Sequence, residues 1–336
     1  MTQGAASPAR IGVVKPCCIG DCVMALPTLD SLAAAFPNAD LQVFVGPHSQ
    51  PIFEGREPWT VRSIGDRITA KAAGRQALSI RAEDFDLVVV LERSRILTSA
   101  FVALAGCPVA AVTRVMPEVR HESVAYLDAL RGLAIEPLVT QPVLRPSRQE
   151  AEIADQLCSC WPRTVLFHPG GAENPGATMP DKRWPASHYV ALARLIESHG
   201  YTVIFSGGAS DRELVSRIVQ DAGLPSDRSL AGQVSLGGAI AVAARSSLYV
   251  GGDTGMSHIA AAAGTPVVAI FGPTNPRRYR PIGDRVTVVA PAASWTLPDV
   301  DLRRASSATV PCTSDVTVDQ VSAACLAILP PGGSSE

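Results

Sequence analysis

The feature that most constrains the fold of this chain is a repeated alternation of short apolar runs with longer segments of helical periodicity. Parallel strands need a crossover connection, usually a helix, so this alternation is typical of α/β proteins with parallel sheets. We therefore expect an α/β protein built from doubly wound sheets.

A proline-rich stretch at residues 136–146 divides the alternation into two series, and 336 residues suffice for two domains of ordinary size. In the first series we expect strands at 11–15, 41–45, 87–91 and 109–112, and helices at 22–36, 96–105 and 122–133. In the second we expect strands at 164–167, 202–205, 248–250 and 267–271, and helices at 186–199, 211–222, 235–245 and 257–263. We predict an N-terminal domain of residues 1–155, a C-terminal domain of residues 156–317, and a last helix at 318–330 that packs back on the first domain.

Composition excludes several functional classes. The net charge is -2 and 18% of the residues are charged, so no nucleic-acid-binding surface is expected. No apolar run reaches the roughly 18 residues that span a bilayer, and the first residues do not resemble a signal peptide, so we expect a cytoplasmic protein. The eight cysteines form no C-x-x-C pair, which gives no reason to expect a metal site. Neither a dinucleotide fingerprint nor a P-loop is present.

Ligands of open α/β domains bind at the carboxyl ends of the strands, so two such domains predict a cleft lined by strand-to-helix loops. The most informative loop is Gly-Gly-Asp-Thr-Gly at residues 251–255, between a buried strand and an alanine-rich helix. Amides at the start of that helix suit a diphosphate, and nearby hydroxyls or an imidazole can add hydrogen bonds. The candidate residues are Thr254, Gly255, Met256, Ser257 and His258. A capped turn with an interior histidine is the structural alternative.

Asp253 would repel a phosphate, so its expected task is to bind a sugar hydroxyl or to cap the helix. The loop at 168–185 ends in Lys182 and Arg183, and a cation there can neutralise a leaving diphosphate with help from Thr178. An exposed basic pair beside a structural tryptophan is the alternative. In the loop at 206–213, Asp211 can hold a ribose or act as an ordinary helix cap.

Several of these motifs occur together in one order along nearly the whole chain. They are Ile-Gly-Asp-Cys-Val-Met-Ala-Leu-Pro at 19–27, His-Pro-Gly at 168–170, Lys-Arg-Trp-Pro at 182–185, Ser-Gly-Gly at 206–208, Gly-Asp-Thr-Gly-Met-Ser-His at 252–258 and Gly-Pro-Thr at 272–274. In these motifs the chain resembles the family 9 glycosyltransferases, the heptosyltransferases of lipopolysaccharide assembly. The resemblance implies a GT-B fold, with two Rossmann-like domains that face a central cleft. It also implies inverting, metal-independent transfer from a nucleotide diphosphate sugar, typically an ADP-heptose, without a cofactor.

The resemblance also implies residue roles. Asp21 would be the general base, Lys182 and Thr178 would face the diphosphate, Val234 would lie near the adenine, and the loop at 253–258 would line the donor site. Without the resemblance, Asp21 is a helix cap, and Cys17, Cys18 and Cys22 around it are small packing residues.

The acceptor stays open between a saccharide, a lipid-linked molecule and a small natural product, and so does contact with a membrane surface. A nucleotide-sugar epimerase and a non-catalytic nucleotide-sugar-binding protein are the rival functions. We expect a monomer.

Overall fold

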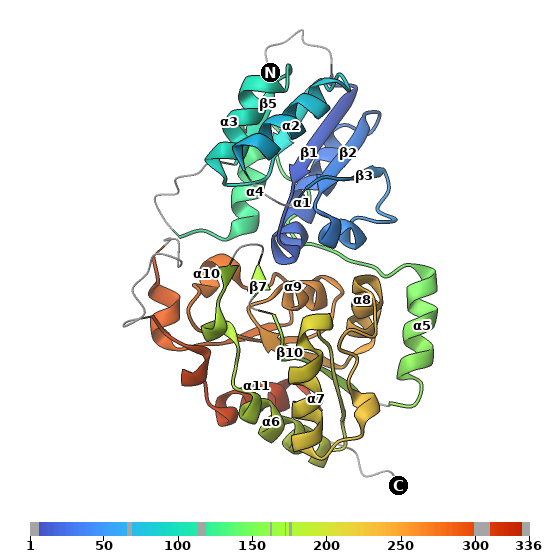
Figure 1. Ribbon diagram of the computed structural model, residues 1–336, viewed down its shortest axis with the longest axis vertical. Helices are drawn as coiled ribbons and strands as arrows, with labels where there is room; N and C mark the ends of the chain where they lie inside the picture. The colour runs from blue at the N-terminus through green and yellow to red at the C-terminus, as the bar shows by residue number, and fades with distance from the viewer. Residues whose placement is uncertain are drawn as a thin grey trace. The chain divides into compact units, whose positions relative to one another are not determined.

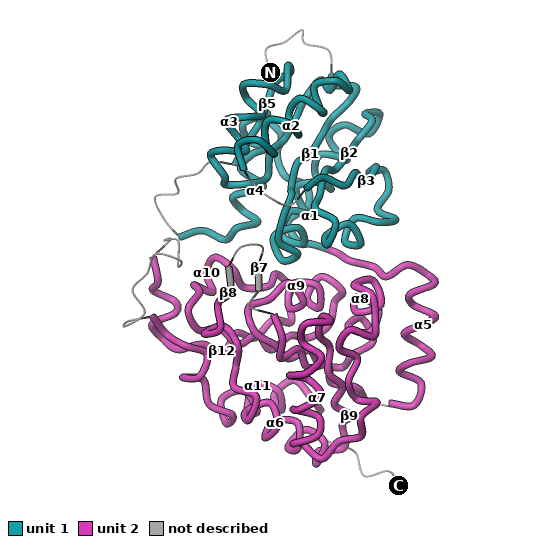
Figure 2. Tube along the Cα trace, in the orientation of Figure 1, with its two compact units in different colours: residues 1–142 teal, residues 143–336 magenta. Residues whose placement is uncertain are grey.

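The structure, a computed structural model, describes residues 7–65, 69–112, 119–161, 163–171, 173–174, 177–298 and 310–330. It divides into two compact units, residues 1–142 and residues 143–336 (Figure 2). Among the described residues, no helix combines the length and apolar character that a membrane span requires.

The first unit contains a five-stranded parallel sheet in the order β3-β2-β1-β4-β5 (Figure 1). Its strands are β1 (Arg10–Lys15), β2 (Asp40–Val45), β3 (Trp59–Ser63), β4 (Leu87–Val90) and β5 (Val109–Ala111). Its helices are α1 (Ile19–Ala35), α2 (Ala70–Arg81), α3 (Arg95–Leu104) and α4 (Glu122–Arg131). The strand order reverses between β1 and β4, which makes the carboxyl end of β1 a topological switch point, where ligands of such sheets bind.

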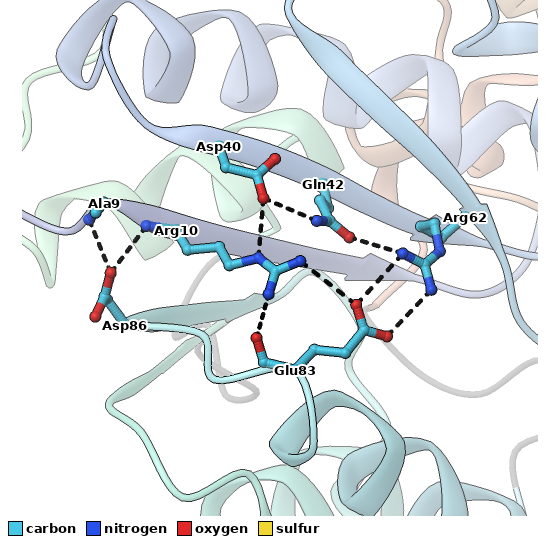
Figure 3. Close-up of polar contacts among 7 residues, drawn as sticks. All are labelled: Ala9, Arg10, Asp40, Gln42, Arg62, Glu83 and Asp86. Carbon is cyan, nitrogen blue, oxygen red and sulfur yellow. Dashed lines mark hydrogen bonds and ion pairs between the residues drawn. The ribbon is translucent and has the colours of Figure 1, made fainter.

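Charged side chains link the starts of β1 and β2 to Arg62 of β3 and to the segment before β4 (Figure 3). Arg10 Nε lies 2.9 Å from Asp40 Oδ2, and Arg62 Nη2 lies 3.1 Å from Glu83 Oε1. Asp86 Oδ2 accepts hydrogen bonds from two successive backbone amides at the start of β1, at 2.8 and 2.9 Å. Because β1 runs away from this network toward Lys15, the network is structural and leaves the carboxyl end of the sheet for binding.

The second unit contains a five-stranded parallel sheet in the order β12-β11-β10-β6-β9. Its strands are β6 (Thr164–His168), β9 (Thr202–Phe205), β10 (Leu248–Gly252), β11 (Val267–Ile270) and β12 (Val286–Val289), with a hairpin of β7 (Glu173–Asn174) and β8 (Ala177–Thr178). Its helices are α5 (Arg148–Cys158), α6 (Ala186–Ser198), α7 (Arg212–Ala222), α8 (Leu236–Arg245), α9 (Gly255–Ala262), α10 (Pro276–Tyr279) and α11 (Val318–Ile328). The switch point lies between β6 and β10, whose following loops carry Lys182 and Asp253.

Short 3-10 helices complete both units. They are η1 (Pro47–Ile52), η2 (Pro180–Lys182), η3 (Ala209–Asp211), η4 (Ser226–Arg228), η5 (Ala292–Thr296) and η8 (Thr313–Asp315).

The last helix does not pack where we expected it. Helix α11 contacts α6, β11 and β12 of the second unit rather than the first domain. Val321 and Cys325 of α11 are fully buried in the core of this unit. Hydrogen bonds fix both flanks of the helix: Trp184 Nε1 donates to Val316 O at 2.8 Å, and Tyr201 OH donates to Pro330 O at 2.7 Å. The expectation that residues 318–330 return to the first domain was therefore wrong.

The boundary between the units also lies earlier than residue 155. Helix α5 packs against α8 (Figure 1), and Arg245 Nη2 lies 2.6 Å from Asp155 Oδ2. Residues 148–155, which we placed in the first domain, thus belong to the second unit.

Candidate active site

Asp21 lies where β1 passes into α1, as the sequence predicts. Helix α1 begins at Ile19, which places Asp21 in its first turn, where the helix dipole favours a negative charge. Its side chain is 28% exposed, so the carboxylate is within reach of a ligand.

Lys15, the last residue of β1, is the functional neighbour that sequence reasoning missed. Its side chain is fully buried, with Nζ 3.0 Å from Glu92 Oε2 and 3.6 Å from Asp21 Oδ2. Burial disfavours the ammonium, but Glu92, Tyr126 and Asp21 outweigh this effect and raise the pKa of Lys15 well above its ordinary value. Lys15 is thus a fixed positive charge beside Asp21. The sequence signal that could have identified it is a lysine at the end of an apolar strand.

In the second unit, three loops at the ends of adjacent strands bring Lys182, Asp253 and Thr274 together. Lys182 Nζ lies 2.7 Å from Asp253 Oδ2, and Thr274 Oγ1 donates to the same oxygen at 2.8 Å. The side chains of Lys182 and Asp253 are 13% and 8% exposed. The cluster therefore holds a nearly buried cation whose charge one carboxylate balances.

Helix α9 starts next to this cluster. Thr254 is its N-cap residue, but the Thr254 side chain accepts no hydrogen bond from the helix. The first-turn amides of a helix have no intrahelical acceptor, which leaves the amides of Gly255 and Met256 suited to an anion. The methyl group of Thr254 faces Gly171, where an added Cβ would come within 2.5 Å of it.

Two residues of this helix that we predicted to line the donor site are buried. Ser257 is fully buried, and its Oγ donates to Gly252 O at 2.5 Å and lies 3.3 Å from Tyr249 OH. His258 is only 4% exposed. The hydroxyl of Ser257 is thus used within the fold, because it can reach the last carbonyl of β10, and His258 fits the interior position that the sequence left open.

Asp211 was predicted to hold a ribose, but the structure uses its carboxylate within the loop. Its Oδ2 accepts from the Gly208 amide at 2.9 Å, and its Oδ1 lies 3.9 Å from Arg183 Nη2. A Cβ on Gly170 would come within 2.3 Å of this carboxylate, so the glycine permits the close approach. Asp211 is buried, and a direct ribose contact is not supported.

His168, at the end of β6, lies in the same junction. Its Nδ1 is 3.0 Å from Ser206 Oγ. Burial lowers the pKa of His168 to about 4, although Asp211 acts in the opposite direction. His168 is therefore neutral near pH 7 and supports the loop rather than adding charge to it.

Two predicted site residues stay predictions. Thr178 pairs with Glu173 in the β7–β8 hairpin, and its side chain lies outside the described part of the structure. Val234 is half-buried and comes directly before Ser235, the N-cap residue of α8.

A segment before α11 braces the loop that carries Lys182, which the sequence did not predict. Thr313 Oγ1 lies 2.9 Å from Asp181 O and 2.8 Å from Arg183 O, so one hydroxyl contacts the carbonyls on either side of Lys182. Gly272 permits this packing, since a Cβ there would come within 2.3 Å of the Thr313 amide nitrogen. Thr313 is thus a positioning residue for Lys182.

Comparison with known proteins agrees with these motifs. Residues 74–307 match the family described as glycosyltransferase family 9 (heptosyltransferase). The chain is 28% identical to lipooligosaccharide heptosyltransferase 2 of Haemophilus influenzae, over 83% of this chain and 88% of the relative. It is 27% identical to lipopolysaccharide heptosyltransferase 2 of Escherichia coli, over 83% and 87%.

Solved structures share the fold. A family 9 glycosyl transferase from Veillonella parvula superposes with a TM-score of 0.81 at 21% identity, covering 95% of this chain and 97% of that one. The E. coli ADP-heptose lipopolysaccharide heptosyltransferase II gives a TM-score of 0.71 at 22% identity, covering 95% and 98%. Together with the two parallel-sheet units, these likenesses confirm the expected GT-B fold class.

Proposed function

Because this chain belongs to glycosyltransferase family 9, we propose that it transfers a heptosyl group from an ADP-heptose to a hydroxyl of a lipopolysaccharide core, with inversion and without a metal ion. The names of its relatives support the donor and the acceptor class. The observation that carries the chemistry is the Lys182–Asp253–Thr274 cluster beside the start of α9.

On the donor side, the leaving diphosphate needs positive charge that is already in place. Lys182 supplies a cation, and Gly255 and Met256 supply amides at a helix N-terminus. The Lys182 ammonium is paired with Asp253 at 2.7 Å, so a diphosphate oxygen has to share or replace that partner. Asp253 then has an oxygen available for a sugar hydroxyl.

On the acceptor side, the attacking hydroxyl has to lose its proton as the new bond forms. In the proposed step the acceptor oxygen attacks the anomeric carbon, and the bond from that carbon to the diphosphate oxygen breaks. The proton passes to Asp21, and the electron pair leaves on ADP, where Lys182 and the α9 amides stabilise it. Lys15, 3.6 Å from Asp21, orients the carboxylate.

The direct test uses the purified full-length chain, ADP-heptose and a heptose-deficient lipopolysaccharide core. ADP release and product mass report transfer, the anomeric coupling in the proton spectrum reports inversion, and EDTA tests metal independence. GDP, UDP and dTDP sugars test the choice of donor. Release of the nucleotide without acceptor would favour an epimerase. Donor binding without nucleotide release would favour a binding protein. Transfer only to small natural-product acceptors would overturn the lipopolysaccharide assignment.

The role of Asp21 has its own test. We expect Asp21→Asn to lower kcat by about 10³-fold, in the range of general base catalysis, while ADP affinity changes less than about twofold. Asp30→Asn is the matched control, because Asp30 lies on the same helix and pairs with Arg56 at 2.6 Å. If Asp21→Asn keeps turnover within about tenfold, a change of only ~1.4 kcal/mol in the barrier, Asp21 is not the base.

A further inference from the structure

Cys17 and Cys18, between β1 and α1, hold their sulfur atoms side by side. Their Sγ atoms are 2.7 Å apart, and both residues are half-buried. Successive side chains of an extended chain point to opposite sides, so adjacent cysteines do not normally meet. Here Cys18 has φ 70°, a left-handed conformation that turns its side chain toward that of Cys17.

The surrounding backbone maintains this unusual conformation. Cys18 is the N-cap residue of α1, and its carbonyl accepts a hydrogen bond from the Cys22 amide at 2.9 Å. A left-handed conformation at a non-glycine residue is strained and persists only where neighbouring structure fixes it. The fold thus keeps two thiols together three residues before Asp21.

The two thiols differ in reactivity. The hydrogen bond between the two thiols, with a further contribution from Lys15, lowers the pKa of Cys17 in spite of its burial. The same hydrogen bond, together with burial, raises the pKa of Cys18. Cys17 therefore has the greater thiolate character and is the attacking sulfur, and Cys18 is placed to resolve an adduct on it.

We propose that Cys17 and Cys18 form a covalent modification site, a dithiol that a low-molecular-weight disulfide oxidises reversibly to a vicinal disulfide. The Cys17 thiolate attacks one sulfur of the reagent, forms a mixed disulfide and releases one thiolate. The Cys18 sulfur then attacks Cys17 Sγ, expels the second thiolate and loses its proton to it. The protein loses two hydrogen atoms, and the reagent disulfide is reduced to two thiols.

The resulting ring is easily reduced. Adjacent Cα atoms are about 3.8 Å apart, whereas disulfides favour about 4.4–6.8 Å, so the ring is strained. Ring closure also rotates the backbone at the N-cap of α1 and displaces Asp21. The expected loss of transfer rests on the proposed function, whereas the disulfide chemistry does not.

Peptide mapping tests the chemistry. The reduced full-length chain is treated with oxidised glutathione, quenched with acid and digested. We expect the peptide that contains both cysteines to lose two hydrogen atoms, to resist alkylation and to recover with dithiothreitol. The Cys17→Ser and Cys18→Ser variants lose this product, and a Cys158→Ser/Cys160→Ser double variant, which removes another closely spaced pair, keeps it. A lasting glutathione adduct on Cys17, or oxidation at the other cysteines alone, overturns the proposal.

Phenylarsine oxide gives a second measurement that needs no oxidant, because trivalent arsenic bridges two thiols with loss of water. The adduct should map to Cys17 and Cys18 and disappear in either single serine variant; retention in Cys18→Ser contradicts a paired site.

Transfer should fall at least about fivefold after oxidation and return with dithiothreitol. A mapped disulfide with unchanged transfer overturns the link to Asp21, and a mapped disulfide in a chain without transferase activity separates this proposal from the proposed function.

Discussion

Replacing Asp253 with asparagine should strengthen ADP binding, although it removes a residue of the proposed donor site. The Lys182 ammonium is 2.7 Å from Asp253 and its side chain is 13% exposed, so Asp253 competes with a diphosphate for this cation. A hydrogen bond between charged groups contributes about 1.5–3 kcal/mol net. If donor binding gives up about half of this, ~1 kcal/mol, Asp253→Asn lowers the Kd for ADP about fivefold. The asparagine oxygen still accepts from Thr274, so the loop is preserved.

Isothermal titration with ADP at fixed ionic strength measures this effect. Glu213→Gln is the matched control, because it removes the same charge at an exposed side chain paired with Arg217. Lys182→Met should weaken ADP binding, and in the double variant the gain from Asp253→Asn should vanish. Equal or weaker ADP binding by a folded Asp253→Asn variant would refute the competition between the carboxylate and the diphosphate.

Three further predictions concern the supports of the site. Burial lowers the pKa of His168 to about 4, so as the pH falls the unfolded chain binds a proton at this histidine before the folded chain does. The free energy of unfolding should therefore fall by roughly 3 kcal/mol between pH 6.5 and pH 4. In urea titrations over this range, His168→Asn should lose this pH dependence. Glu92→Gln removes the carboxylate nearest to the buried Lys15 and should lower the free energy of unfolding in urea by about 3 kcal/mol. The double variant Lys15→Met/Glu92→Leu removes both charges and should lower it clearly less. Equal losses in the two variants would contradict a buried ion pair at this position. Thr313→Val removes the hydroxyl that contacts the carbonyls on either side of Lys182. It should raise the Kd for ADP about threefold in titration and leave kcat little changed. Unchanged ADP affinity would mean that Thr313 does not position Lys182.

The sequence predicted where the candidate residues that follow strands lie in the fold. Asp21, Lys182 and Asp253 each follow a buried strand, and the sheet topology places their loops at the carboxyl edges. The partner of Lys15 was not predictable, because Glu92 is 77 residues away in sequence. The hydrogen bond from Ser257 to a backbone carbonyl was not predictable, because a position after a glycine turn does not tell whether the hydroxyl faces a ligand or the backbone.

Two of the missed elements lie at the edges of the sheets, whereas helix α2 (Ala70–Arg81), which we also did not predict, is a helix of the first unit. Strands β3 (Trp59–Ser63) and β12 (Val286–Val289) were not predicted, and both are edge strands with side chains partly exposed. An edge strand needs no continuous apolar run, so it lacks the signal that marked the central strands. The last helix was misplaced for a related reason: an apolar helix fits either core, and only contacts such as Trp184 with Val316 decide between them.

The two charged clusters lead to opposite expectations for removal of a carboxylate. The Lys182 ammonium pairs with Asp253 at 2.7 Å, so loss of Asp253 leaves the cation available to a diphosphate. Lys15 is closer to Glu92 at 3.0 Å than to Asp21 at 3.6 Å, so it keeps its nearest partner when Asp21 is replaced. Asp21→Asn should therefore remain folded and lose turnover without losing ADP. This independence allows a loss of activity in that variant to be attributed to the missing base.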